Sequence, residues 1–62
     1  MPHIQVQHIA GRSAEQKRAL ARELTDAYAR VTGTGPEKIW VTFHDVPAED
    51  WATGGTLIAD RD

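Results

Sequence analysis

The sequence contains no cysteine, so the chain can form no disulfide and perform no thiol chemistry. Its three histidines lack cysteine partners and do not match the ligand set of a structural zinc site. Sixty-two residues make one domain, residues 1–62, which excludes two-domain enzymes. A core of this size rarely contributes more than about 3–5 kcal/mol of stability. Because disulfide and metal are both excluded, we expect oligomerisation to complete the core.

A surplus of basic residues is also missing. Seven lysine and arginine residues face nine aspartate and glutamate residues, for a formal net charge of −2. Proteins that bind nucleic acid usually carry a basic surplus, so we predict no nucleic-acid partner. No apolar run approaches the roughly 18 residues of a membrane-spanning helix, and the first residues lack the layout of a signal peptide. We therefore predict no membrane partner and a cytoplasmic location.

Local signals in the first half of the chain predict a strand and then a helix. Apolar and polar side chains alternate over residues 2–9, as in a strand. Ser13 and Gln16 fit a capping box that begins a helix over residues 14–32, and Gly33 ends it. The helix is predicted to carry one apolar stripe, formed by Leu20, Leu24, Ala27, Tyr28 and Val31. We interpret the charged residues off that stripe as a solvated face: Lys17, Arg18, Arg22, Asp26 and Arg30.

The second half of the chain predicts another strand and a small hairpin. Residues 39–46 are rich in β-branched and aromatic side chains, as in a strand that ends at Pro47. Residues 48–51 are predicted to form a short turn, and Gly54-Gly55 closes a hairpin with residues 56–58. The order predicts an α/β fold: a single βαβ unit with parallel strands and a short C-terminal hairpin. This unit is too small to cover both faces of its sheet, so we expect oligomerisation to complete the sheets.

Strand geometry separates two residues of interest within one chain. Pro2 begins the first strand and Arg12 follows its end, so ten residues place them about 30 Å apart. If two protomers pair their sheets antiparallel about a twofold axis, Pro2 of one chain approaches Arg12 of the other. Parallel pairing also places Trp40, early in the second strand, at the same sheet edge as Pro2. A site that uses these residues must therefore be shared between subunits.

Pro2 has a chemical and a structural interpretation. Removal of Met1 exposes a secondary amine, and an α-amino group has a reference pKa of about 7.7–8.0. A nearby guanidinium and apolar walls lower the pKa of such an amine further. It can then act as a general base near neutral pH, or attack a carbonyl to form an iminium. Alternatively, Pro2 merely begins an edge strand, where its missing N–H costs nothing. Position alone favours this structural interpretation.

Four segments together resemble a known family. With the strand–helix–strand–hairpin order, they are similar to the 4-oxalocrotonate tautomerase family of the tautomerase superfamily over essentially the whole chain. The segments are Met1-Pro2, Gly11-Arg12-Ser13, Glu15-Gln16-Lys17 and Trp51-Ala52-Thr53-Gly54-Gly55. The resemblance implies an isomerase without cofactor or metal that acts on a small-molecule carboxylate. It also implies a homohexamer, built as a trimer of dimers, although related members form trimers or heterohexamers.

The resemblance implies roles for three residues. Pro2 matches the amino-terminal general base that moves a proton between two carbons of an enol or unsaturated keto acid. Arg12 matches the arginine that holds a substrate carboxylate, which its planar guanidinium meets with two hydrogen bonds. Trp51 matches an aromatic wall position that keeps the pocket apolar. Taken singly, Arg12 reads as a solvated loop residue and Trp51 as a packing residue, but together with Pro2 the functional interpretation is favoured.

Trp40 departs from the pattern of the family. Members that act on dicarboxylates carry a second arginine at this position, whereas tryptophan offers one N–H donor and no positive charge. One hypothesis is that Lys38, expected on the same strand face as Trp40, partly replaces the missing cation. Another is that the substrate is an aromatic monocarboxylate that rests on Trp40 and Trp51. The structural alternative is that Lys38 is an exposed loop lysine.

Two other functions remain open. The first keeps the fold and the assembly without catalysis, as a non-catalytic subunit of an oligomer or a ligand-binding protein. It rests on Trp40 and on Met1, because a Pro2 nitrogen acylated by Met1 is neither basic nor nucleophilic. The second is a relative of the hydrolases or dehalogenases of the superfamily, in which a protonated Pro2 acts as an acid. That function needs a residue to activate water, and none stands out.

The remaining polar residues are interpreted as structural. His3 and His8 alternate onto opposite strand faces, so with His44 they are predicted to be surface or interface histidines rather than metal ligands. The acidic residues near the end of the chain are interpreted as solubilising charges: Asp45, Glu49, Asp50, Asp60 and Asp62.

Overall fold

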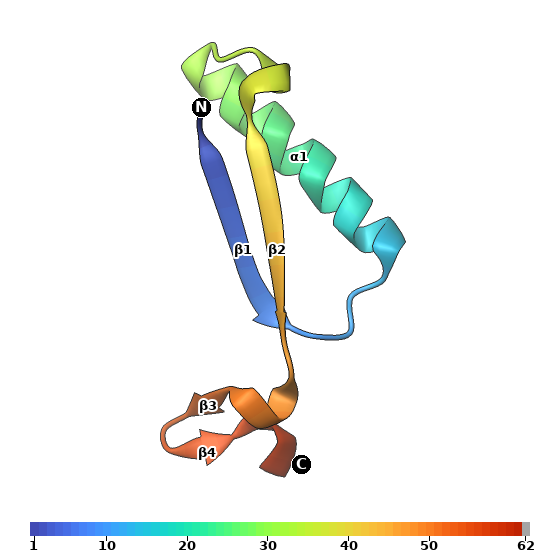
Figure 1. The fold of residues 1–62 in the computed structure, drawn as a ribbon, viewed down its shortest axis with the longest axis vertical. Helices are drawn as coiled ribbons and strands as arrows, with labels where there is room; N and C mark the ends of the chain where they lie inside the picture. Colours follow the sequence, from blue (N-terminus) through green and yellow to red (C-terminus); the bar gives the residue numbers. More distant parts are fainter. Residues whose placement is uncertain (62) are drawn as a thin grey trace.

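Two parallel strands form the centre of the molecule (Figure 1). The computed structural model describes residues 1–61, and Asp62 lies outside the described residues. Strand β1 (His3–Ile9) pairs in parallel with β2 (Trp40–Val46) along its whole length. One backbone hydrogen bond extends the ladder at each end, from Trp40 N to Pro2 O at 2.9 Å and from Ala10 N to Val46 O at 2.9 Å. The parallel pairing predicted from the sequence is confirmed.

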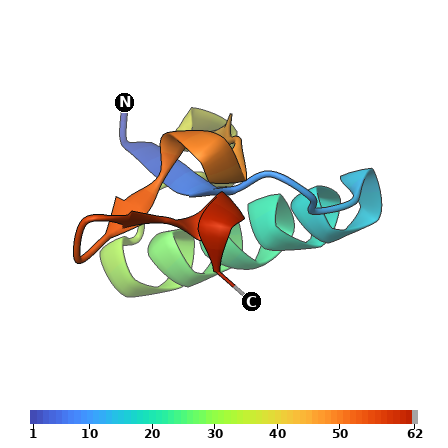
Figure 2. The same ribbon diagram turned by 90° about the horizontal axis from the view of Figure 1, so that it is seen from below.

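Helix α1 (Ala14–Thr32) connects the two strands and lies across one face of the sheet (Figures 1 and 2). The predicted capping box begins it, because Ser13 N donates to Gln16 Oε1 at 2.9 Å and Gln16 N donates to Ser13 Oγ at 3.1 Å. Gly33 ends it in the left-handed conformation at φ 77°, which glycine adopts without steric cost. The strand, helix and second strand form the predicted βαβ unit.

The core between α1 and the sheet is thin. Among residues 1–61, Ile39 is the only buried hydrophobic residue, and it is still 8% exposed. Leu24, Ala27 and Tyr28 of the predicted stripe are half-buried, but Leu20 is 37% exposed and Val31 is 80% exposed, so the stripe is covered only in its middle. Val31 lies in the last turn of α1, which projects past the starts of the strands and has no sheet beneath it (Figure 1).

Two short 3₁₀ turns flank β2. Turn η1 (Pro36–Lys38) precedes the strand, and Ile39 follows it as a cap rather than as the first strand residue, so β2 begins one residue later than predicted. Proline at the start of η1 explains the turn, because its fixed φ and missing N–H suit the first position of a helical turn. Turn η2 (Ala48–Asp50) follows the strand.

The C-terminal segment forms a small hairpin at the far end of the sheet from Met1 (Figure 1). Strands β3 (Ala52–Thr53) and β4 (Thr56–Leu57) pair antiparallel across Gly54-Gly55. Both glycines have positive φ, 59° and 85°, as the favoured two-residue hairpin turn requires. The hairpin prediction is confirmed, although Ile58 begins turn η3 (Ile58–Asp60) rather than extending β4.

The single chain is extended. Its radius of gyration is 14.7 Å, with extents of 43 × 23 × 15 Å, whereas a compact domain of this length has a radius of about 10–11 Å. Several large apolar side chains are exposed along this elongated surface, among them Met1, Leu20, Val31, Trp40 and Leu57. Within residues 1–61, no helix has both the length and the apolar character needed to cross a bilayer.

Candidate functional site

Pro2 and Trp40 lie side by side at the start of the sheet. The Pro2 carbonyl accepts a hydrogen bond from Trp40 N at 2.9 Å, and His3 is the register partner of Trp40. The Trp40 side chain is 53% exposed, whereas Pro2 is half-buried. The predicted placement of Trp40 at the same sheet edge as Pro2 is confirmed. The pairing leaves a large aromatic surface beside the first strand residue.

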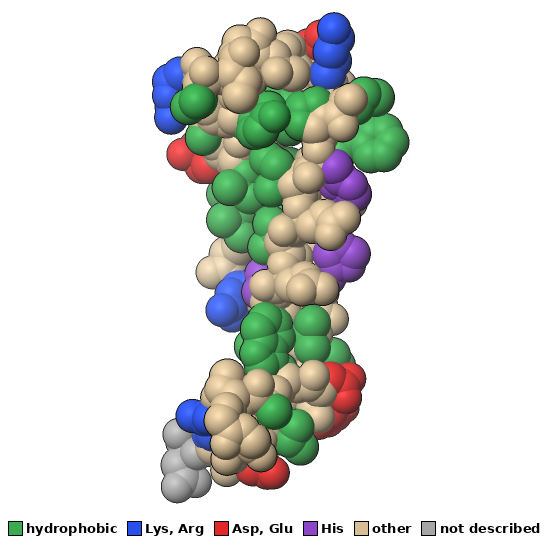
Figure 3. Space-filling view, turned by 90° about the vertical axis from the view of Figure 1, so that its left-hand side faces the viewer, with side chains coloured by type: hydrophobic (Ala, Val, Ile, Leu, Met, Phe, Trp, Pro, Cys, Tyr) green, Lys and Arg blue, Asp and Glu red, His purple; other side chains and the backbone are tan. Residues whose placement is uncertain are grey.

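A chain of polar contacts on the outer face of the sheet orients Trp40. The His3 imidazole meets the indole of Trp40 edge-on, with ring centroids 5.9 Å apart. His3 Nε2 lies 2.9 Å from Thr42 Oγ1, which lies 3.3 Å from His44 Nε2. Imidazole side chains accordingly follow one side of the surface in Figure 3. The single Thr42 hydroxyl links two imidazoles, and the ring of the first packs against Trp40.

Lys38 is not placed as the sequence argument assumed. Lys38 precedes the predicted strand by one residue, and strand alternation was extended back to it, so it was expected on the face of Trp40. Lys38 instead ends turn η1, where its backbone N–H donates to Gly35 O at 3.0 Å. Alternation along β2 therefore does not fix its direction, and the shared-face argument is wrong in its premise.

Arg12 and Trp51 lie near the opposite end of the sheet. Arg12 is exposed in the loop between β1 and α1. Trp51 is half-buried after η2, and its carbonyl accepts from Ile58 N at 2.8 Å at the base of the hairpin. Figure 1 shows this loop and this hairpin at the end of the sheet away from the N-terminus. One chain therefore separates Pro2 and Trp40 from Arg12 and Trp51.

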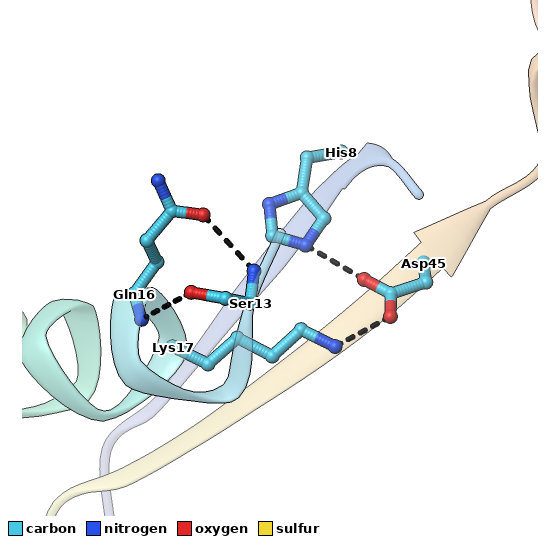
Figure 4. A network of polar contacts seen from close by, with 5 residues as sticks. All are labelled: His8, Ser13, Gln16, Lys17 and Asp45. Carbon is cyan, nitrogen blue, oxygen red and sulfur yellow. Dashed lines mark hydrogen bonds and ion pairs between the residues drawn. The ribbon is translucent and has the colours of Figure 1, made fainter. Parts of the chain in front are cut away.

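A charged network ties three elements together near the Arg12 loop (Figure 4). Lys17 Nζ of α1 donates to Asp45 Oδ2 of β2 at 2.5 Å, and His8 Nε2 of β1 lies 2.8 Å from Asp45 Oδ1. An ionised carboxylate only accepts hydrogen bonds, so His8 Nε2 carries the proton and donates it. These hydrogen bonds, that from Lys17 foremost, lower the pKa of the Asp45 carboxyl. The His8 ring also stacks on Phe43, with centroids 6.0 Å apart.

This network corrects two interpretations made from the sequence. Lys17 was assigned to a solvated helix face and Asp45 to the solubilising charges, yet the two side chains form an ion pair and are 29% and 38% exposed. The relevant signal is the strand register, because His8 stands opposite Asp45 in the parallel pair. That register is a tertiary feature, and no local pattern in the sequence specifies it.

Comparison with known proteins identifies the family. The model of the family described as "Tautomerase enzyme" matches residues 2–61, and the chain belongs to this family. A 2-hydroxymuconate tautomerase of Comamonas testosteroni is 38% identical over 55 residues, which are 89% of this chain and 87% of that protein. Membership supports a tautomerase, and therefore an isomerase, activity.

Solved structures agree with this assignment. The crystal structure of a 4-oxalocrotonate tautomerase homologue is 35% identical and superposes with a TM-score of 0.93 over 100% of this chain and 98% of that one. A heterohexamer 4-oxalocrotonate tautomerase from Chloroflexus aurantiacus is 32% identical, with a TM-score of 0.91 over 97% of each chain. The resemblance to this family and the fold class predicted from the sequence are both confirmed.

Among residues 1–61, no group of three or more histidine, cysteine, aspartate or glutamate side chains is arranged to hold a metal ion.

Proposed function

We propose that this protein moves a proton within a 2-keto acid or its enol, with Pro2 as the general base and without a cofactor. The proposal rests on the position of Pro2, which lies directly before β1 and beside the half-exposed Trp40. The Pro2 nitrogen becomes a free secondary amine once Met1 is removed. In an enol acid, this amine accepts the proton of the enol hydroxyl and delivers it to a carbon of the conjugated system. The electron pair of the O–H bond becomes the carbonyl, and that of the C=C bond takes the proton. The step needs no co-reactant.

The site is proposed to be shared between protomers. Pro2 and Arg12 are about 30 Å apart along β1, too far for one small substrate. Antiparallel pairing of two sheets about a twofold axis brings Pro2 of one protomer to Arg12 of another. The extended shape of the chain and its exposed apolar side chains are consistent with such an assembly. We propose a homohexamer, built as a trimer of dimers, and note that the Chloroflexus relative is a heterohexamer.

Arg12 is proposed to hold the substrate carboxylate. A guanidinium binds a carboxylate with two parallel hydrogen bonds and stays charged at all accessible pH values. Arg12 also stands just before the start of α1, where the free amides and the helix dipole favour an anion. In the proposed assembly, Arg12 lies beside the Pro2 amine of another protomer. Its positive charge disfavours protonation of that amine and lowers its pKa.

The preferred substrate is proposed to be an aromatic monocarboxylate. Trp40 offers an exposed ring in place of a second cation, and Trp51 offers another aromatic wall. A substrate ring gains stacking contacts there, whereas a second carboxylate would meet no fixed positive charge. An alternative version retains Lys38 as the second cation. Lys38→Ala separates the two, because only that version predicts a change in kinetics.

The first test asks whether the base exists in the cell. The intact mass of the protein from its native host should lack methionine, which frees the Pro2 amine. A mass that retains Met1 would contradict the proposal and favour a non-catalytic subunit or ligand-binding protein, a function that Trp40 also favours because it provides no cation.

The second test is Pro2→Ala, assayed on the enol form of 3-phenyl-2-oxopropanoate. General-base catalysis contributes a factor of about 10²–10⁴ to the rate. We therefore expect Pro2→Ala to decrease kcat by a factor in that range. Both proteins must be shown by mass to have lost Met1, since a retained methionine would mimic the effect. Indistinguishable rates for the two proteins would remove the role of Pro2 as base.

A further inference from the structure

We propose that Asp45 is a positioning residue: through Lys17 and His8 it holds the loop that carries Arg12, and thereby sets the affinity for the substrate carboxylate. The inference rests on the proposed function, in which Arg12 binds that carboxylate. It assigns a role to a network outside the residues proposed to touch substrate.

The loop that carries Arg12 is short, and its strand side is fixed to β2. Residues 10–13 connect β1 to α1. Ala10 N donates to Val46 O at 2.9 Å, which fixes the first residue of the loop. His8 Nε2 donates to Asp45 Oδ1 at 2.8 Å and adds a side-chain tie beside it. The strand side of the loop is therefore attached to β2 by both backbone and side chain.

The helix side of the loop is fixed by the cap and by Lys17. Ser13 and Gln16 exchange the two hydrogen bonds of the capping box at 2.9 and 3.1 Å, and Lys17 N donates to Ser13 O at 3.0 Å. These bonds order the first turn of α1 but do not attach it to the sheet. The bond from Lys17 Nζ to Asp45 Oδ2 at 2.5 Å makes that attachment.

Asp45 consequently joins the two sides of the loop that carries Arg12, through the two bonds drawn in Figure 4. One carboxylate oxygen binds the strand before the loop, and the other binds the helix after it. Deletion of the carboxylate leaves the first turn of α1 free to shift against the sheet, and Arg12 shifts with it. Such a shift weakens the hydrogen bonds from Arg12 to the substrate carboxylate, because hydrogen bonds depend steeply on distance and angle.

The charges support this role. Lys17 is engaged by Asp45, whereas no hydrogen-bond or ion-pair partner of the Arg12 guanidinium is found in the part of the chain that the structure describes. Of these two neighbouring cations, Arg12 is therefore the one available to an incoming anion. The hydrogen bonds from Lys17 and His8 also keep Asp45 ionised, because they lower the pKa of its carboxyl.

The test compares Asp45→Asn with the wild type on two substrates. The enol form of 3-phenyl-2-oxopropanoate has the carboxylate, and the enol of its methyl ester lacks that charge. We expect Asp45→Asn to raise KM for the acid about five- to tenfold with kcat within about twofold, and to leave KM for the ester within about twofold. Asp26→Asn is the matched control, because it removes the same charge from an exposed helix position.

Arg12→Ala distinguishes failure of this inference from failure of the proposed function. In the Arg12→Ala background, Asp45→Asn should add no further increase in KM for the acid. If Arg12→Ala raises KM and Asp45→Asn does not, the positioning role is wrong and the proposed function stands. If Arg12→Ala leaves KM unchanged, Arg12 does not bind the carboxylate; both its proposed role and the positioning role of Asp45 are then wrong, while Pro2→Ala still tests the role of Pro2 separately.

Substitutions of Lys17 provide a second route if Asp45→Asn does not fold. Lys17→Met should raise KM for the acid, and Lys17→Arg should restore it because arginine still donates to Asp45. A Lys17→Met protein that folds and has the wild-type KM for the acid would overturn the inference. Equal losses on acid and ester would also overturn it, because they would indicate a general structural role.

Discussion

The two ends of the sheet differ in chemistry. The end that holds Pro2 presents a half-exposed indole packed edge-on against the His3 imidazole, with no ion pair among its described residues. The opposite end presents an arginine on a loop that a lysine–aspartate–histidine network holds in place. One end therefore suits proton transfer against an aromatic surface, and the other suits binding of an anion. In the proposed function, each chain therefore carries two different half-sites rather than one complete site.

The extended chain also leaves the site and the core incomplete. Neither end encloses a substrate in a single chain, because Pro2 and Arg12 lie at opposite ends of β1. The helix covers one face of the sheet only, and Ile39 is the one buried hydrophobic residue among those described. Assembly is thus expected to complete both the core and the site. Substitutions at the two ends should consequently change different kinetic constants.

The largest effect outside Pro2 is expected for Arg12→Ala. Loss of a charged hydrogen-bonding partner costs about 1.5–3 kcal/mol, so KM for an enol acid should rise about 10- to 100-fold. Arg12→Lys should recover only part of this loss, because an ammonium cannot form the paired hydrogen bonds of a guanidinium. Steady-state kinetics on the acid and its methyl ester measure both. An unchanged KM for the acid would show that the end of the sheet that carries Arg12 does not bind the carboxylate.

A smaller change is expected at the Pro2 end from Trp40→Arg. Arginine restores a cation and removes the aromatic surface. The substrate preference should therefore shift about tenfold toward the dicarboxylate 2-hydroxymuconate, which corresponds to the free energy of one moderate charged hydrogen bond. The ratio of kcat/KM for 2-hydroxymuconate to that for 3-phenyl-2-oxopropanoate enol reports the shift. Trp40→Phe is the control, since it keeps a ring without a charge. A ratio that is the same in all three proteins would exclude Trp40 from substrate choice.

The smallest effect concerns stability in acid. The hydrogen bonds from Lys17 and His8 lower the pKa of Asp45 below 3.8 in the folded protein. A lowered carboxyl pKa stabilises the fold above the unfolded-state value, and that stabilisation is lost as the pH falls through the folded-state value. Asp45→Asn should therefore reduce Tm at neutral pH and converge with the wild type in acid.

Thermal unfolding of both proteins from about pH 7 to about pH 2.5 covers this window. Asp26→Asn again serves as the control for a change in net charge. A difference in Tm that stays constant across the whole range would show that the Asp45 charge does not contribute to stability.

Local signals in the sequence predicted the helix, the strands and the hairpin. The features that they did not predict depend on how these elements pack together. The capping box at Ser13, the stop at Gly33 and the turn at Gly54-Gly55 depend on a few neighbouring residues, and all three are confirmed. Val31 fits the helical stripe by spacing, yet it is exposed because the last turn has no sheet beneath it. Whether a turn meets the sheet depends on the path of the helix, which spacing does not encode.

In the candidate site, too, some placements follow from the sequence and others depend on tertiary packing. The placement of Trp40 beside Pro2 follows from parallel pairing and is confirmed. Lys38 was expected to share a face with Trp40 by strand alternation, but Pro36 directs that segment into a 3₁₀ turn. The ion pair of Lys17 and Asp45 joins residues 28 positions apart, and only the packing of α1 on the sheet brings them together. The catalytic and binding roles of Pro2, Arg12, Trp40, Trp51 and Lys38 stay predictions.

The central claim, that each site combines the two ends of different chains, is tested by subunit complementation. Pro2→Ala and Arg12→Ala proteins, each strongly impaired, are unfolded together, refolded as a mixture and assayed on the enol form of 3-phenyl-2-oxopropanoate. If sites are shared, random assembly of an equal mixture should restore about a quarter of wild-type activity, because that fraction of sites combines an intact Pro2 with an intact Arg12. If the mixture shows only the average of the two separate proteins, the site does not combine the two ends of different chains.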